Sequence, residues 1–122
     1  MSLALNIMKG GYSASSAKAI NGNIATGLTA TGTTITTALD LNADTNVIGT
    51  CASGAGVQVY AAEIGDSQEI YNGGANDCRV YPDSTSAQFN ALGAANAFLL
   101  APNTMCYVRK ITSTRWIVNL SA

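Results

Sequence analysis

The chain contains very few charged residues and no histidine. Only 11% of its 122 residues are Asp, Glu, Lys or Arg, against roughly a quarter in an average soluble domain. A soluble monomer normally carries many surface charges, because they oppose association. A chain this neutral is explained more easily if copies of itself or a larger assembly cover much of its surface. The composition therefore predicts a structural subunit that forms a homo-oligomer, and not an enzyme.

Basic residues and long apolar runs are also scarce. The formal net charge is −1, and Arg109-Lys110 is the only adjacent basic pair. Binding a nucleic-acid backbone needs a concentrated basic stripe, so no nucleic acid is expected as a partner. The apolar run 3–8 is interrupted by Asn6 and is far shorter than the roughly 20 residues of a membrane span. It also lacks the basic start and cleavage site of a signal peptide, so neither a membrane nor standard secretion is expected.

The three cysteines do not form a recognisable metal or redox motif. No two of Cys51, Cys78 and Cys106 have the Cys-x-x-Cys spacing that such motifs use. Because there is no histidine, a structural zinc would need a carboxylate ligand, which is an uncommon set. We expect small buried hydrophobic residues on strands, with one disulfide and a leftover thiol as the alternative. No metal and no cofactor are predicted.

Nothing in the sequence predicts catalytic residues. A serine nucleophile usually needs histidine as its general base, and the chain has none. The stretch 11–15 (GYSAS) lacks the second glycine of a nucleophile elbow. The stretch 53–56 (SGAG) is not followed by the Lys-Ser/Thr of a phosphate-binding loop. The prediction for catalytic residues is therefore none.

Two acidic stretches are predicted to be structural. The stretch 40–44 (DLNAD) begins like a calcium loop, but Thr45 and Cys51 stand where that loop needs glycine and a carboxylate. We expect a polar turn between two strands. Glu63, Asp66 and Glu69 form an acidic cluster beside Gly65 and Ser67. The expected role of this cluster is a solvated rim or a partner for Arg79, with acid–base chemistry as the alternative.

Short β-rich runs alternate with turn signals from residue 24 onward. This spacing predicts an all-β domain, an antiparallel β-sandwich or jelly-roll-like barrel of about 8–10 short strands. The threonine run within 33–41 is β-branched, which favours a strand. Asn72-Gly73 predicts a hairpin with a primed turn. The candidate strands are 24–28, 33–41, 47–52, 57–61, 68–72, 77–81, 87–92, 97–101, 105–111 and 115–120.

Residues 1–23 are predicted to form an extended N-terminal arm, and residues 24–122 the β-sandwich body. Leu3, Leu5 and Ile7 alternate in a way that suits strand addition to the sheet edge of a neighbouring subunit. Tyr12 is the expected exposed anchor, so these four residues are the predicted partner-binding set. Aromatic residues of the body are expected in the core or a subunit interface, with sugar stacking as the alternative. They are Tyr60, Tyr71, Tyr81, Phe89, Phe98, Tyr107 and Trp116.

Four segments between residue 28 and the C-terminus resemble small virion proteins of tailed bacteriophages. They are LTATGTTITTALDLNADTNVI, VYAAEIGDSQEIYNGGANDCRVYP, FNAL and NAFLLAPNTMCYVRKITSTRWIVNLSA. The resemblance implies a compact β-domain without catalytic residues, found alone on phage heads or appended to fibre and tail components. Together with the length of the chain, it favours a capsid decoration (cement) protein. The alternative is a fibre-tip or tail receptor-binding module.

A decoration protein of this kind is expected on the outer surface of the virion capsid, after assembly in the cytoplasm of the bacterial host. Its expected partners are the major capsid protein and further copies of itself. A homotrimer is expected, because one copy cannot cover its own neutral surface and a trimer fits the threefold sites of a capsid.

Overall fold

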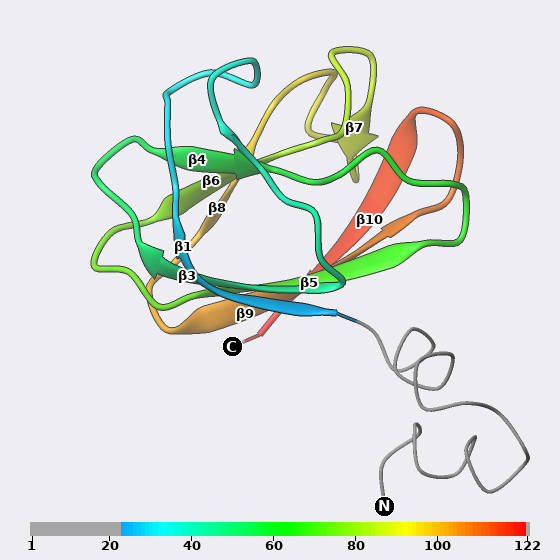
Figure 1. Ribbon diagram of the computed structural model, residues 1–122. Helices are drawn as coiled ribbons and strands as arrows, with labels where there is room; N and C mark the ends of the chain where they lie inside the picture. Colours follow the sequence, from blue (N-terminus) through cyan, green and yellow to red (C-terminus); the bar gives the residue numbers. More distant parts are fainter. Residues whose placement is uncertain (1–22, 122) are drawn as a thin grey trace, which may run out of the picture.

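A computed structural model describes residues 23–121, which contain ten strands and no helix (Figure 1). The prediction of an all-β chain is therefore confirmed for this range. Within it there is also no helix that could cross a membrane. The predicted arm, except for its last residue, lies outside the described residues, and so do Leu3, Leu5, Ile7 and Tyr12.

Most strands overlap the β-rich runs that the sequence predicts. The predicted strand 115–120 has the observed bounds, and most of the others differ by a few residues at their ends. The strands are β1 (Ile24–Thr29), β2 (Leu39–Asp40), β3 (Thr45–Thr50), β4 (Gly56–Gln58), β5 (Ser67–Asn72), β6 (Cys78–Tyr81), β7 (Gln88–Phe89), β8 (Phe98–Leu100), β9 (Thr104–Lys110) and β10 (Arg115–Leu120).

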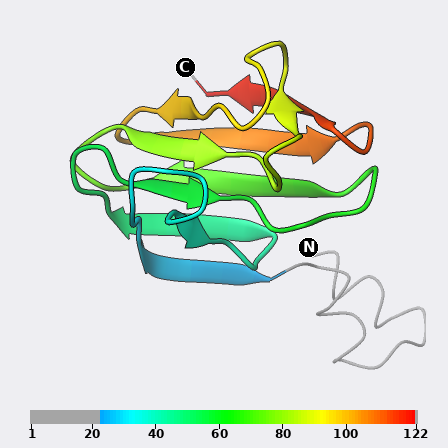
Figure 2. The same cartoon turned by 90° about the horizontal axis from the view of Figure 1, so that it is seen from above.

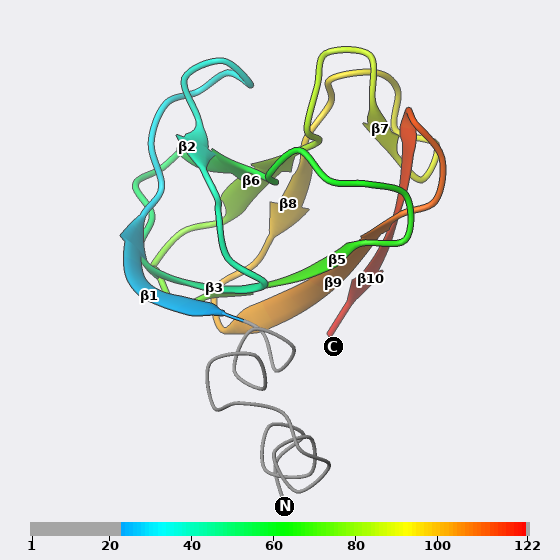
Figure 3. The same ribbon diagram turned by 45° about the vertical axis from the view of Figure 1, so that its right-hand side comes forward.

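The strands form two sheets that face each other across one core (Figures 1 and 3). Sheet A has the order β1-β3-β5-β9-β10-β7, and sheet B has the order β2-β4-β6-β8. From β1 to β6 the chain passes alternately from one sheet to the other. Each return lays a strand parallel to the previous strand of the same sheet. The first six strands therefore make three turns of a β-solenoid.

The last four strands close this coil with a different pairing. Strand β9 runs antiparallel between β5 and β10, and β8 runs antiparallel to β6. Strand β7 pairs in parallel with the beginning of β10. The expectation of antiparallel sheets throughout is thus wrong for the coil, because its connections cross to the opposite sheet instead of turning back beside the same strand. Figure 2 shows the coil and its closing strands from above.

The core is filled from the inward faces of both sheets. In β5, Gln68, Ile70 and Asn72 are buried while the residues between them are half-exposed, as expected from the alternation of side chains along a strand. Three aromatic rings from β7, β8 and β10 pack together at the closing end. The centroid of the Phe89 ring lies 4.9 Å from that of Phe98 and 6.1 Å from that of Trp116. The expectation of core aromatic residues is confirmed for these three.

The threonine run forms a turn, so the predicted strand 33–41 is mostly wrong. Only Leu39 and Asp40 of this run belong to a strand. The N–H of Ala38 donates to the carbonyl oxygen of Thr34 at 3.0 Å, and the hydroxyls of Thr34 and Thr37 lie 2.8 Å apart. Threonine hydroxyls offer the backbone such local hydrogen bonds as an alternative to a sheet. Here that alternative overrides the β-branched preference.

The predicted hairpin after Tyr71 is also wrong. Strand β5 ends at Asn72 in sheet A, and β6 begins at Cys78 in sheet B, so the segment between them is a crossover. Neither glycine after Asn72 has a positive φ, which a primed turn would require. Gly74 is needed for another reason, since a Cβ atom there would lie 2.8 Å from the backbone nitrogen of Cys51.

Candidate functional site

The acidic stretches are used in local hydrogen bonds. The carboxylate of Asp44 accepts from the N–H of Asn23 at 3.0 Å and from the hydroxyl of Tyr60 at 3.4 Å. Burial raises the pKa of Tyr60, and the negative charges of Asp44 and Asp66 raise it further. Residues 23–121 contain no group of three or more His, Cys, Asp or Glu side chains that could hold a metal ion. The segment 41–44 joins β2 in sheet B to β3 in sheet A, so it lies between two strands as predicted, but it is a crossover with Leu41 and Ala43 buried and not a polar turn.

The cluster of Glu63, Asp66 and Glu69 does not contain a partner for Arg79. Glu63 and Asp66 are exposed in the loop before β5, where the carboxylate of Asp66 accepts from the N–H of Glu63 at 3.1 Å. The solvated rim is confirmed for these two residues. Arg79 belongs to sheet B, and its Nη1 donates to the carbonyl oxygen of Thr33 at 3.4 Å. The predicted pairing with the acidic cluster is wrong.

All three cysteines are buried free thiols. Cys78 and Cys106 belong to strands, and Cys51 follows β3 directly. The expected burial is confirmed, and the alternative of one disulfide is wrong. Burial raises the pKa of Cys106 to about 12, against a smaller lowering by a hydrogen bond from the backbone of Ile70. Burial, together with the neighbouring Cys51, also raises the pKa of Cys78. Thiols of this kind are poor nucleophiles, because the thiolate is the reactive form.

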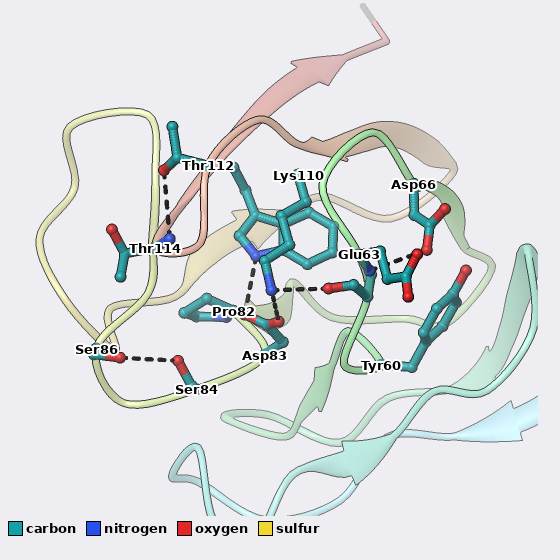
Figure 4. A network of polar contacts seen from close by, with 12 residues as sticks. Tyr60, Glu63, Asp66, Pro82, Asp83, Ser84, Ser86, Lys110, Thr112 and Thr114 are labelled. Atoms are coloured by element: carbon teal, nitrogen blue, oxygen red, sulfur yellow. Dashed lines mark hydrogen bonds and ion pairs between the residues drawn. The ribbon is translucent and has the colours of Figure 1, made fainter.

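One buried polar network ties the two sheets together, and the sequence patterns did not indicate it (Figure 4). Lys110 Nζ lies 2.7 Å from a carboxylate oxygen of Asp83 and donates to the carbonyl oxygen of Ala62 at 2.9 Å. The other oxygen of Asp83 accepts from Trp116 Nε1–H at 3.0 Å. The side chains of Lys110 and Asp83 are only 12% and 5% exposed. Both oxygens of Asp83 are engaged, and the network connects β9 and β10 to the loops after β4 and β6.

The outer face of sheet A is a surface that no other described segment covers, and it presents apolar and aromatic side chains beside a few charged ones. In Figures 1 and 3 no other described segment lies across it. Ile117 and Tyr107 are 42% and 38% exposed there. They belong to adjacent strands, where Ile117 pairs with Arg109 and Tyr107 pairs with Asn119. We use "outer face of sheet A" for the side chains that alternate with the buried ones on β5, β9 and β10. They are Ser67, Glu69, Tyr71, Met105, Tyr107, Arg109, Arg115, Ile117 and Asn119.

The outer face of sheet B is hollowed, in contrast to sheet A. One hollow of about 440 Å³ lies against the loop after β7, with Asn96 and Leu92 in its wall. A second of about 260 Å³ lies on the other side, with Asn76 and Asp77 in its wall. Arg79 lines both, together with Leu99, its direct neighbour on β8. We call these two adjoining spaces the Arg79 hollow. No sequence pattern indicates this hollow, since the partner predicted for Arg79 is the acidic cluster.

No family model matches the chain, and neither the search of curated proteins nor that of solved structures finds a similar one. The argument for function therefore rests on the residues and their arrangement.

Proposed function

We propose that this protein is a non-enzymatic structural subunit that binds the outside of a bacteriophage capsid and stabilises it. The observation that carries this proposal is the exposed apolar area on the outer face of sheet A, which no other described segment covers. The core of a protein interface is enriched in aromatic residues and in arginine. Tyr107 and Ile117 supply the apolar area, with Arg109 paired to Ile117 and Glu69 paired to Tyr107.

The fold supports a mechanical role. Two sheets share a single core and form a two-layer body. The Lys110–Asp83 ion pair and the Trp116 hydrogen bond connect the closing strands to the loop after β6. A decoration protein has to hold neighbouring capsid subunits in a fixed relation, and a stiff body of this kind suits that task. The resemblance to small phage virion proteins points in the same direction.

Self-association is part of the proposal. Strand β1 is the edge of sheet A and pairs only with β3 among the described strands, and such an edge is a template for a further strand. Leu3, Leu5, Ile7 and Tyr12 of a neighbouring copy are the proposed anchors, within a homotrimer. The register shifts around Gly27 confine such pairing to a few residues. Light scattering measures the mass in solution, and a monomer at high micromolar concentration would contradict the trimer.

The attachment face can be tested with two matched variants. Ile117→Asp places a charge on the outer face of sheet A, and Leu99→Asp places one on the outer face of sheet B, both at exposed strand positions. Capsids of the phage that encodes the chain are sedimented with each protein. We expect at least a tenfold loss of binding, about 1.4 kcal/mol, for Ile117→Asp, and little change for Leu99→Asp.

Three other results would revise the proposal. Loss of binding for Leu99→Asp alone would move the attachment to sheet B. Failure of the unmodified protein to sediment with capsids would overturn the capsid function. Binding to purified tail fibres in place of capsids would favour the alternative, a fibre-tip or tail receptor-binding module. Circular dichroism and thermal melting confirm beforehand that both variants are folded.

A further inference from the structure

We propose that the Arg79 hollow binds a sugar that carries a carboxylate, such as a uronic acid unit. This inference does not rest on the proposed capsid attachment. Arg79 and Leu99 lie on the outer face of sheet B, whereas Ile117 and Tyr107 lie on the outer face of sheet A.

The guanidinium of Arg79 has unused hydrogen-bonding capacity. Within residues 23–121 its one side-chain hydrogen bond is the 3.4 Å contact with the carbonyl oxygen of Thr33, which also accepts from the hydroxyl of Tyr81 at 3.0 Å. The only ion pair within residues 23–121 joins Lys110 to Asp83, so Arg79 forms none there. A guanidinium carries five N–H donors in a planar fork that matches a carboxylate or a phosphate. The hollow therefore contains one oriented cation that can accept an anionic group.

The other polar groups favour a carboxylate over a phosphate or sulfate. Asp77 lines the smaller space next to Arg79, and its charge would repel a second or third negative charge. The same carboxylate would accept a hydrogen bond from a neutral hydroxyl. A ligand with a single negative charge for Arg79 and hydroxyl donors for Asp77 fits both of these side chains.

Amide side chains on both rims add further acceptors. Asn96 donates through Nδ2 to the carbonyl oxygen of Leu92 at 2.7 Å, and Asn76 donates through Nδ2 to the carbonyl oxygen of Cys51 at 2.9 Å. No protein hydrogen bond is found for either Oδ1 atom among the described residues, so each can accept from a ligand hydroxyl. One cation surrounded by hydroxyl acceptors is the complement of an acidic sugar.

Apolar side chains between these polar groups suit the C–H faces of a sugar ring. Leu99 is 57% exposed and Leu92 is 47% exposed, and both line the larger space. The wall that contains Asn96 is held by the backbone, since the N–H of Ala95 donates to the carbonyl oxygen of Ala87 at 2.9 Å. Ala95 has a φ of +63°, a strained value for alanine of the kind that is often found at functional sites. The wall is therefore shaped before any ligand binds.

The test is a titration of the full-length ¹⁵N-labelled protein followed by NMR. The probes are methyl β-D-glucuronide, methyl β-D-glucoside (the same ring without the carboxylate), acetate and inorganic phosphate. We expect saturable shifts with the glucuronide, with a dissociation constant of about 1 mM as is usual for so small a ligand. The shifts should centre on Asn96, Leu99 and Asp77. The glucoside and acetate should each bind at least tenfold more weakly.

Variants connect the signal to Arg79. Arg79→Met should weaken glucuronide binding at least tenfold, whereas Arg109→Met, on the opposite sheet, should leave it unchanged. If Arg79→Met does not fold, Leu99→Glu tests the same point, because it places a carboxylate directly opposite Arg79 in the register of β6 and β8. Equal binding of glucoside and glucuronide, tighter binding of phosphate, unchanged glucuronide binding by Arg79→Met or Leu99→Glu, or no saturable shift would each overturn the inference.

Discussion

The coil of β1 to β6 and the closing strands β7 to β10 fill the same core in different ways. The coil buries polar side chains from sheet A: Asn46 on β3, and Gln68 and Asn72 on β5. The closing strands bury aromatic rings from β7, β8 and β10. The difference shows what each region needs. In the coil, every crossing between sheets leaves backbone groups without a ladder partner, whereas the closing strands have to fill volume.

Gln68 and Asn72 show how amides complete the coil. Gln68 accepts from the N–H of Tyr60 and donates to its carbonyl oxygen, both at 3.3 Å, just beyond the end of β4. Asn72 donates to the carbonyl oxygens of Leu100 and Asn76, each at 2.8 Å, and accepts from the N–H of Gly74 at 2.9 Å. A buried amide supplies donors and an acceptor at one position. Each of these side chains thus replaces ladder hydrogen bonds where the chain leaves a sheet.

The largest effect is expected in the closing strands. Trp116→Ala removes a fully buried ring that packs near Phe89 and donates to Asp83. Such a substitution should lower the free energy of unfolding by about 4 kcal/mol, measured by urea denaturation. Its neighbour Ile117 is the matched control, because Ile117→Ala at a half-exposed position should change stability by less than about 1 kcal/mol. Equal losses for the two variants would show that the aromatic cluster does not hold the closing strands.

A smaller loss is expected for the amides of the coil. Asn72→Ala leaves two carbonyl oxygens and one N–H without their partner, and we expect a loss of about 2–3 kcal/mol. Asn46→Ala is the comparison. Among the described residues, the Asn46 side chain makes one hydrogen bond, from Nδ2 to the carbonyl oxygen of Ala43 at 2.8 Å, and its buried Oδ1 has no partner. The free energy of unfolding of Asn46→Ala should be lower than that of the unmodified protein by about 1 kcal/mol or less. A larger loss for Asn46→Ala in the same denaturation assay would refute the role given to Asn72.

The smallest effect concerns pH and joins the two regions, because Cys106 on β9 pairs with Ile70 on β5. Burial raises the pKa of this thiol from the ordinary value of 9.0 to about 12. The folded state therefore keeps a proton that the unfolded state loses, and the stabilisation is complete below about pH 9 and is lost as the pH rises toward 12. When the pH is raised from about 8 to about 10.5, the free energy of unfolding should fall in both proteins. The fall should be about 1–2 kcal/mol smaller for Cys106→Ala than for the unmodified protein.

Val108→Ala controls for packing in that experiment, since Val108 is buried on the same strand and does not titrate. Its free energy of unfolding should be lower at every pH but should change with pH as steeply as that of the unmodified protein. If the free energy of unfolding of Cys106→Ala also changed with pH as steeply as that of the unmodified protein, the thiol would not contribute to the pH dependence.

Local sequence patterns predicted the positions of individual strands better than they predicted which strands pair with each other. The predicted β-rich run 115–120 has the observed bounds of β10, because β-branched and aromatic residues favour a pleated strand. The threonine run and the Asn72-Gly73 pair were misassigned, since both signals are compatible with two local structures. In each case hydrogen bonds from the side chains selected the other one: Thr34 with Thr37, and Asn72 with residues from the loop and from β8.

The amino-acid sequence by itself determined that the described chain is all-β, where most strands lie, and that the cysteines are buried. These properties depend on side-chain type and on spacing over a few residues. Only the tertiary structure decided that β1 to β6 coil in parallel, that Lys110 reaches Asp83, and that Arg79 opens into a hollow on the face opposite Ile117. A strand pattern does not specify its neighbour, because the same alternating face can pair in either direction. Pairing is settled by how all the strands together enclose one core.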